Sequence, residues 1–167
     1  INAMAAPYGA VTFLPTGGIT EKNINDYLSF PKIVACGGSW MVPADAVANK
    51  DWARIESLTR TAVNTMLGLE VRHIGINSGD PETAMKDAQM IAKLLGWPLD
   101  DHKNAIFVDN AFEVMKVPFR GKNGHFAIAC NNIKRARWHL ERRGFVFDDD
   151  SAIMKDGKLR AIYLKDD

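Results

Sequence analysis

The chain has 167 residues, 47% of them hydrophobic and 25% charged, and 21 basic residues against 20 acidic ones give a net charge of +1. These values are typical of a soluble globular protein and exclude a charged, disordered tail. The chain has no excess of basic residues that would indicate a nucleic-acid partner, and its apolar runs are too short to cross a membrane. Because no signal peptide pattern is visible and Cys36 and Cys130 lack any ligand spacing, we expect a cytoplasmic protein with reduced thiols.

Two glycine pairs each close an apolar, strand-like run near the N-terminus. Gly17-Gly18 follows residues 11–15, and Gly37-Gly38 follows residues 32–36. Such turns let the backbone approach a ligand and leave N–H groups free to bind an anion. Two of them in consecutive strand–helix units are typical of the phosphate site after strands seven and eight of a (β/α)8 barrel. An isolated glycine pair would indicate only a tight turn.

Helical patterns follow both turns. The first is predicted over residues 20–28 with Thr20 as its cap, and the second runs from residue 44 to Leu67, with Trp52 on its apolar side and Gly68 as its stop. Residues 1–67 therefore predict the last two strand–helix units of a TIM barrel. The preceding chain is too short for six further strands and lacks an initiating methionine, so we expect a fragment of a longer protein.

The order of motifs in this region resembles the 2-keto-3-deoxy-6-phosphogluconate/4-hydroxy-2-oxoglutarate (KDPG/KHG) aldolase family. The resemblance covers roughly residues 3–64, and the matching motifs are Met4-Ala5-Ala6-Pro7-Tyr8, Phe13-Leu14-Pro15-Thr16-Gly17-Gly18-Ile19, Asn25-Asp26-Tyr27-Leu28 and Ala35-Cys36-Gly37-Gly38-Ser39-Trp40-Met41-Val42. The resemblance implies a (β/α)8 homotrimer that uses no cofactor. It also implies cleavage of a 2-keto-3-deoxy sugar acid, through a lysine Schiff base, into pyruvate and an aldehyde: glyceraldehyde 3-phosphate from a phosphorylated substrate, or glyoxylate from 4-hydroxy-2-oxoglutarate.

The resemblance also assigns roles to the two turns. Thr16, Gly17 and Gly18 would line the pyruvate and phosphate end of the site, and Gly37, Gly38 and Ser39 would hold the substrate phosphate. In this family the Schiff-base lysine lies on strand six, which would precede this chain. Lys22, Lys32 and Lys50 do not lie on a barrel strand facing the mouth, so we expect the isolated chain to be inactive as an aldolase.

A different pattern begins at residue 68 and occurs twice, about 50 residues apart. The first copy has a strand over 71–76, a helix from Asp80-Pro81 to Gly96, and strands over 105–108 and 112–117. The second has a strand over 125–130, a helix capped by Asn131 or Asn132 and ended by Gly144, and strands around Asp156-Gly157. Residues 68–167 therefore predict a domain of two strand–helix–strand modules whose last strand is missing.

This paired arrangement resembles the vicinal oxygen chelate superfamily, which includes glyoxalase I and is built from two βαβββ modules. The resemblance implies that His73, Glu113 and His125 bind a divalent metal ion and leave positions open for two substrate oxygens. The alternative is that these side chains are ordinary rim residues. We expect His102 and His139 to be solvated. Arg120 lies in a basic loop, 120–124, that could meet an anion but is more simply a solvated loop.

Three functions follow as alternatives. The first is the C-terminal part of a KDPG/KHG aldolase, a carbon–carbon lyase that assembles as a homo-oligomer. The second is a glyoxalase-like, metal-dependent enzyme with a barrel remnant as an appendage. The third is a non-catalytic binding or oligomerisation module. Metal content distinguishes the second function from the third.

Overall fold

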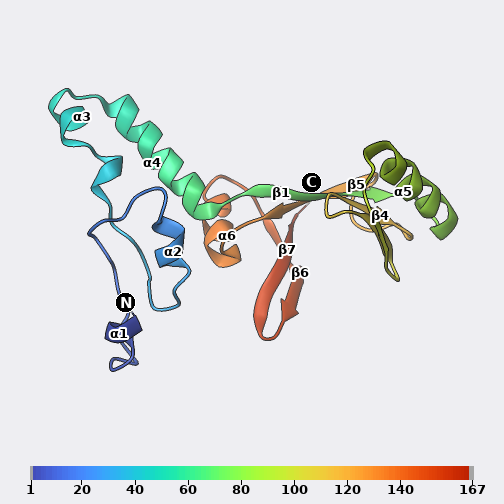
Figure 1. Cartoon of the computed structure of the whole chain (residues 1–167), viewed down its shortest axis with the longest axis horizontal. Helices are drawn as coiled ribbons and strands as arrows, with labels where there is room; N and C mark the ends of the chain where they lie inside the picture. The colour runs from blue at the N-terminus through green and yellow to red at the C-terminus, as the bar shows by residue number, and fades with distance from the viewer. Residues whose placement is uncertain (1, 166–167) are drawn as a thin grey trace. The chain divides into compact units, whose positions relative to one another are not determined.

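A computed structural model describes residues 2–165 and divides the chain into two compact units, each described here by itself (Figure 1). The first unit holds the chain up to Leu69 together with Cys130–Gly144 and Met154–Ala161. The second holds Glu70–Ala129, Phe145–Ile153 and the chain from Ile162 onward. The fold is mixed α/β, and the described residues form no closed barrel. None of the described helices combines the length and apolar character needed to cross a membrane.

The two strands expected over residues 11–15 and 32–36 are reduced to one parallel bridge, between Phe13 and Ile33. The Phe13 N–H donates to the Lys32 carbonyl at 2.7 Å, and the Val34 N–H donates to the Phe13 carbonyl at 3.2 Å. The expected strand length was wrong, although the two segments do lie side by side and parallel. Pro15 and Pro31 flank the bridge, and because proline has no N–H to donate, the ladder cannot extend through them.

The helices of the first unit are α1 (Asn2–Ala5), α2 (Ile24–Leu28), η1 (Ser39–Met41), α3 (Ala44–Ala48), α4 (Trp52–Leu67) and α6 (Ile133–Glu141). Helix α2 begins after Asn23, not at Thr20, whose N–H instead donates to the Asn23 side chain at 2.8 Å. The helix expected from residue 44 to Leu67 is broken, because Lys50 has a left-handed φ of 56°. Helix α4 then starts at a new cap, Asp51.

The C-terminal end of α4 is joined to the start of α6. Gly68 ends α4 with a φ of 56°, as its sequence predicts. The Asn131 side-chain amide fills the space that a side chain at Gly68 would need, and donates to the carbonyls of Thr65 at 3.2 Å and Met66 at 3.3 Å. Asn132, not Asn131, caps α6. Asn131 therefore supplies donors to the last carbonyls of α4, which have no partner within their own helix.

The second unit is built on a five-stranded mixed sheet in the order β2-β3-β4-β1-β5. Its strands are β1 (Glu70–Asn77), β2 (Leu99–Asp101), β3 (Ala105–Val108), β4 (Phe112–Met115) and β5 (Gly124–Ala129). Strand β1 is parallel to β4 and antiparallel to β5. The expected strands around Asp109-Asn110 are confirmed as β3 and β4, but β4 ends at Met115 rather than residue 117. The short, exposed β2 was missed.

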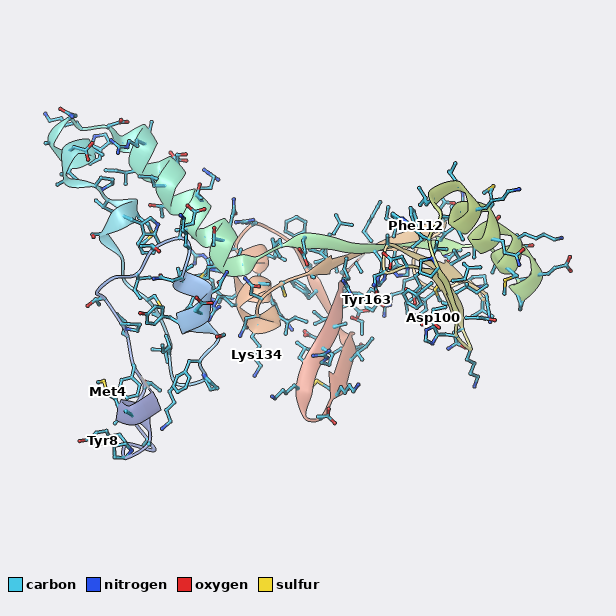
Figure 2. The ribbon with its side chains drawn as sticks, in the orientation of Figure 1. Met4, Tyr8, Asp100, Phe112, Lys134 and Tyr163 are labelled. Atoms are coloured by element: carbon cyan, nitrogen blue, oxygen red, sulfur yellow. The ribbon has the colours of Figure 1, made fainter. Side chains whose placement is uncertain are left out.

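Helix α5 (Pro81–Leu95) packs on one face of this sheet (Figure 1). The core between them consists of fully buried Ala84, Ala88, Ile106, Val108 and Val114, with Phe112 (labelled in Figure 2) packed against it. Small alanines on the helix let it approach the branched side chains of β3 and β4 closely. The opposite face of the sheet carries His73, Glu113 and His125.

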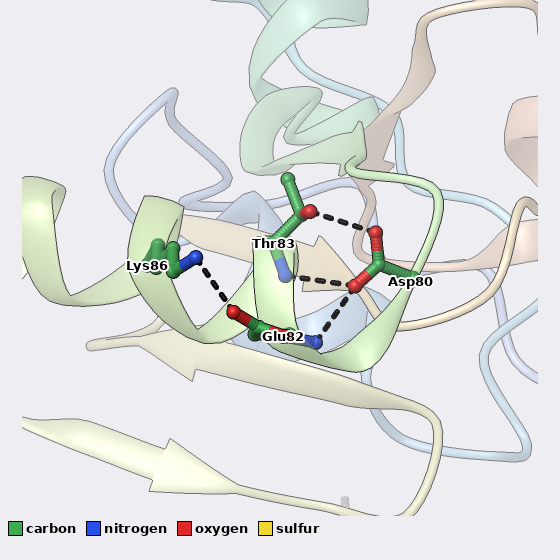
Figure 3. A network of polar contacts seen from close by, with 4 residues as sticks. All are labelled: Asp80, Glu82, Thr83 and Lys86. Carbon is green, nitrogen blue, oxygen red and sulfur yellow. Dashed lines mark hydrogen bonds and ion pairs between the residues drawn. The ribbon is translucent and has the colours of Figure 1, made fainter.

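The start of α5 is fixed by its own side chains, as its sequence predicts. Asp80 Oδ1 accepts hydrogen bonds from the N–H groups of Glu82 and Thr83, both at 2.9 Å, and Asp80 Oδ2 accepts one from the Thr83 hydroxyl at 2.7 Å (Figure 3). Lys86 and Glu82 form an ion pair one turn further on, at 2.7 Å. Because the cap satisfies two free N–H groups, the helix begins at Pro81.

The second copy of the repeat keeps the order of its elements but not the sheet of the first. After β5 and α6 come β6 (Phe147–Lys155) and β7 (Lys158–Leu164), which pair as a two-stranded sheet around Asp156 and Gly157. In the first copy the corresponding hairpin joins the main sheet through β4. Among the described residues no strand plays that part for the second copy, and the one strand pairing that joins the two copies there is that of β1 with β5.

Candidate metal centre

Three side chains of the second unit converge on one face of the sheet. His73 Nε2 lies 3.1 Å from Glu113 Oε2, His125 Nε2 lies 3.2 Å from the same oxygen, and the two Nε2 atoms are 3.3 Å apart. Their side chains are 20%, 20% and 11% exposed in the order His73, Glu113, His125. The three residues expected from the sequence to share a metal ion are therefore brought together.

Strand register explains why they meet. Glu113 on β4 is the partner of Gly75 on β1, and Gly75 is the partner of His125 on β5. The three positions form one row across the sheet, and paired residues project to the same face. His73 precedes Gly75 by two residues on β1, so its side chain points to that face too. Neighbouring strands therefore supply one candidate ligand each.

Gly75 leaves the space that His125 occupies. A Cβ built on Gly75 would collide with the His125 ring atoms Cε1, Nδ1 and Nε2. The imidazole can therefore cross above β1 and reach His73 and Glu113. Gly75 was not predicted as part of the site, although a glycine inside a strand is a recognised sign of close approach by another group.

The electrostatics favour a neutral His73. Burial lowers the pKa of His73 below its ordinary value, and the neighbouring Glu113 carboxylate only partly opposes this effect. A neutral imidazole is the form that binds metal ions. Nδ1 of His125 is buried and has no hydrogen-bond partner among the described residues, so the ring's interactions are directed through Nε2 into the triad.

The donor set fits a first-row divalent metal. Ligand atoms about 2.1 Å from a common ion and 3.1–3.3 Å from one another subtend angles of roughly 95–105° at it. These angles lie between octahedral and tetrahedral values. Two imidazoles and one carboxylate on one side of an ion are the arrangement of a facial triad, which keeps the opposite positions open.

Aromatic side chains surround the triad. The Phe107 ring lies edge-on to His73, with centroids 6.0 Å apart, and the Phe119 ring lies 5.9 Å from that of His125. Phe119 also lies 5.8 Å from Tyr163 (labelled in Figure 2). Burial, and then the charge of Glu113, raises the pKa of Tyr163, so its phenol stays protonated at neutral pH.

Arg120 was expected in a solvated loop, and residues 121–123 of that loop are exposed, but Arg120 itself is only partly exposed. Its guanidinium lies 4.6 Å from the centroid of the Tyr163 ring and donates to Asp148 Oδ2 at 2.9 Å. His139 was also expected to be solvated but is half-buried, and burial lowers its pKa. His102 is exposed as expected and lies 2.9 Å from Asp100.

The residues expected at a phosphate site lie in the first unit, around the parallel bridge. The Gly37 N–H donates to the Pro15 carbonyl at 2.9 Å, and a Cβ on Gly37 would come within 3.3 Å of the Thr16 methyl group. The two glycine turns therefore lie against each other. Gly18 has a φ of 67°, and Gly17 and Ser39 are exposed. The Trp40 ring fills the space beside Gly38.

The ammonium group of Lys32, which precedes the second glycine turn, is hydrogen-bonded to backbone carbonyls. Lys32 Nζ donates to the carbonyls of Ala5 at 2.8 Å and Tyr8 at 3.0 Å. Lys22 and Lys50 are exposed. These two hydrogen bonds hold the Lys32 side chain at the backbone carbonyls of Ala5 and Tyr8.

Comparison with known proteins identifies relatives of the N-terminal region alone. Residues 1–58 match the family described as KDPG and KHG aldolase, and no family matches the rest of the chain. The 2-dehydro-3-deoxy-phosphogluconate aldolase of Dickeya dadantii is 49% identical over 63 residues, which are 38% of this chain and 30% of that protein. The KHG/KDPG aldolase of Escherichia coli is 48% identical over 63 residues, with the same coverage of 38% and 30%.

A third relative, the 2-dehydro-3-deoxy-phosphogluconate aldolase of Treponema pallidum, is 47% identical over 60 residues, 36% of this chain and 29% of that protein. The chain thus spans about 30% of the length of the curated relatives it matches. Its N-terminal region is homologous to the C-terminal part of KDPG/KHG aldolases. The resemblance noted from the motifs is confirmed for this region.

Proposed function

We propose that the second unit binds a divalent transition-metal ion through His73, Glu113 and His125, as part of a glyoxalase-like, metal-dependent enzyme. One observation carries the proposal: donor atoms from three separate strands lie within 3.1–3.3 Å of one another. The glyoxalase-like assignment is supported by the βαβββ order of the first repeat and by the pairing of β1 with β5.

A bound divalent ion would supply Lewis acidity to substrate oxygens placed in its open positions. The chain's own residues set the conditions for that chemistry. The single carboxylate of Glu113 leaves a net charge of +1 on the loaded triad, which favours an anionic ligand. Phe107 and Phe119 provide apolar surfaces on two sides and reduce the access of water to the histidines.

Metal binding tests this proposal directly. The chain, freed of metal with a chelator, should bind one equivalent of Mn²⁺ or Co²⁺ in calorimetry. His125→Ala and Glu113→Gln should weaken that binding at least tenfold, whereas His102→Ala, in the exposed pair with Asp100, should leave it unchanged. Binding that survives both ligand variants, or no binding by the wild-type chain, would identify the triad as a hydrogen-bonded cluster and favour a non-catalytic module.

A second function concerns the first unit. We propose that residues 1–58 form the phosphate-binding end of a KDPG/KHG aldolase whose remaining barrel strands and Schiff-base lysine lie elsewhere in the protein. Identity of 49% to such an aldolase carries this proposal, and the contact between the two glycine turns supports it. Its substrate would be a 2-keto-3-deoxy sugar acid phosphate, and its assembly a homotrimer.

Borohydride trapping tests the aldolase proposal. Protein made from the complete gene should become covalently labelled by pyruvate on reduction, because a Schiff base links substrate to lysine. The 167-residue chain should remain unlabelled under the same conditions. Labelling of Lys32, or of any other lysine within residues 2–165, at a catalytic rate would contradict the proposed division of roles.

A further inference from the structure

A loop between β4 and β5, residues 116–123, carries the cationic side chain of Arg120 close to the proposed metal centre. Asn77, at the end of β1, holds this loop at two points. Its side-chain oxygen accepts from the Phe119 N–H at 3.1 Å, and its side-chain amide donates to the Gly121 carbonyl at 2.9 Å. The position of Arg120, between these two points, is therefore set before any ligand arrives.

Arg120 is joined to the triad through aromatic rings. Its guanidinium lies over Tyr163 at 4.6 Å, Tyr163 contacts Phe119 at 5.8 Å, and Phe119 contacts the metal ligand His125 at 5.9 Å. The charge of Glu113 also acts on Tyr163. Tyr163 and Phe119 thus connect Arg120 to the triad by a series of direct contacts.

The guanidinium retains binding capacity. Arginine has five N–H donors, and within residues 2–165 the structure gives Arg120 one hydrogen-bond partner, Asp148 Oδ2. Its side chain is 37% exposed. A guanidinium with free, planar donors binds carboxylate or phosphate oxygens in pairs, which a lysine cannot do.

We propose that Arg120 forms a second, anion-binding subsite of the metal centre, which selects small organic dianions carrying an apolar or aromatic body between two acidic groups. This inference rests on the proposed metal site. One acidic group would bind at the open positions opposite His73, Glu113 and His125. The body would lie against Phe119 and Tyr163, and the other acidic group would pair with Arg120. Asp148 competes with that second group for the guanidinium.

Binding of two matched probes to the Mn²⁺-loaded chain tests the subsite. The dianion 4-(2-carboxyethyl)benzoate and the monoanion 3-phenylpropanoate differ only by the remote carboxylate. Calorimetry should show the dianion binding at least tenfold more tightly. Arg120→Gln should reduce this ratio to near one while Mn²⁺ affinity stays within twofold, and Lys122→Gln, in the same loop, should leave the ratio unchanged.

Asp148→Asn should raise the affinity for the dianion, which Arg120→Gln lowers, because it releases Arg120 from its ion pair. If Arg120→Gln does not fold, unchanged dianion affinity in Asp148→Asn would count against the subsite. Mn²⁺ binding with no preference for the dianion, or a preference that Arg120→Gln leaves intact, would overturn the subsite alone. Failure of the wild-type chain to bind Mn²⁺ would overturn the metal site on which it rests.

Discussion

Gly75 and His125 face each other across the β1–β5 pair, and the imidazole occupies the space that a side chain at Gly75 would fill. This relationship allows a residue of the second repeat to reach ligands of the first. We expect Gly75→Ala to displace the His125 ring and to weaken Mn²⁺ binding at least tenfold.

The same substitution should lower stability by about 1–3 kcal/mol, a typical cost of overpacking, which urea unfolding would measure. Gly9→Ala is the matched control, because nothing lies within 4 Å of a Cβ there. Unchanged metal affinity in Gly75→Ala would show that His125 does not need this space to act as a ligand.

The sheet core provides a prediction about stability. Ile106 is fully buried beneath α5, and Ile106→Ala should lower the free energy of unfolding by about 2–5 kcal/mol, because it removes apolar contacts and leaves a cavity. Ile128→Ala removes the same atoms from a side chain that is 54% exposed and should cost much less. Equal losses in urea unfolding would contradict the placement of α5 over β3 and β4.

The lowered pKa values of two histidines predict how the stability of the metal-free chain depends on pH. Burial lowers the pKa values of His73 and His139 in the folded state, whereas in the unfolded chain both side chains have a pKa of about 6.5. Below that pH the unfolded state binds protons more readily than the folded state, so stability is lost as pH falls. The stability that depends on these two histidines being neutral is fully present above about pH 6.5.

Urea unfolding in the presence of a chelator measures this dependence. The midpoint should be lower at pH 5.5 than at pH 7.5, and His139→Gln should reduce the difference. A urea midpoint that is higher at pH 5.5 than at pH 7.5 would be opposite to this prediction and would contradict the burial of these two rings.

Substitution of Ser39 tests the proposed phosphate-binding role of the second glycine turn. If Ser39 binds the distal phosphate, Ser39→Ala loses a hydrogen bond to a charged group, worth about 1.5–3 kcal/mol. The contact lies far from the bond that breaks, so the loss should appear as KM raised about tenfold or more with kcat little changed. Steady-state kinetics of protein from the complete gene would measure both. Ser57→Ala, exposed on α4, should change neither, and a fall in kcat alone would place Ser39 in the chemical step.

Several features could be predicted from the sequence because short-range chemistry determines them. Asp80, Pro81 and Gly96 set the ends of α5 through a cap, a fixed φ and a left-handed stop. The hairpin at Asp156-Gly157 follows from residues that tolerate positive φ. Where local signals were weaker, the predictions failed: the break at Lys50 and the start of α2 after Asn23 were both missed.

The sequence named the candidate ligands His73, Glu113 and His125 through its resemblance to the vicinal oxygen chelate superfamily, whose ligand positions were carried over onto the strands of the repeat. It also determined the aldolase relationship of the N-terminal region, since the ordered glycine motifs lie close together in the chain. Only the tertiary structure decided that the three ligands meet, that Gly75 makes room for His125, and that Arg120 lies over Tyr163 beside Asp148. The reason is that strand register and loop packing join residues distant in sequence, and no local preference of either partner encodes such a contact.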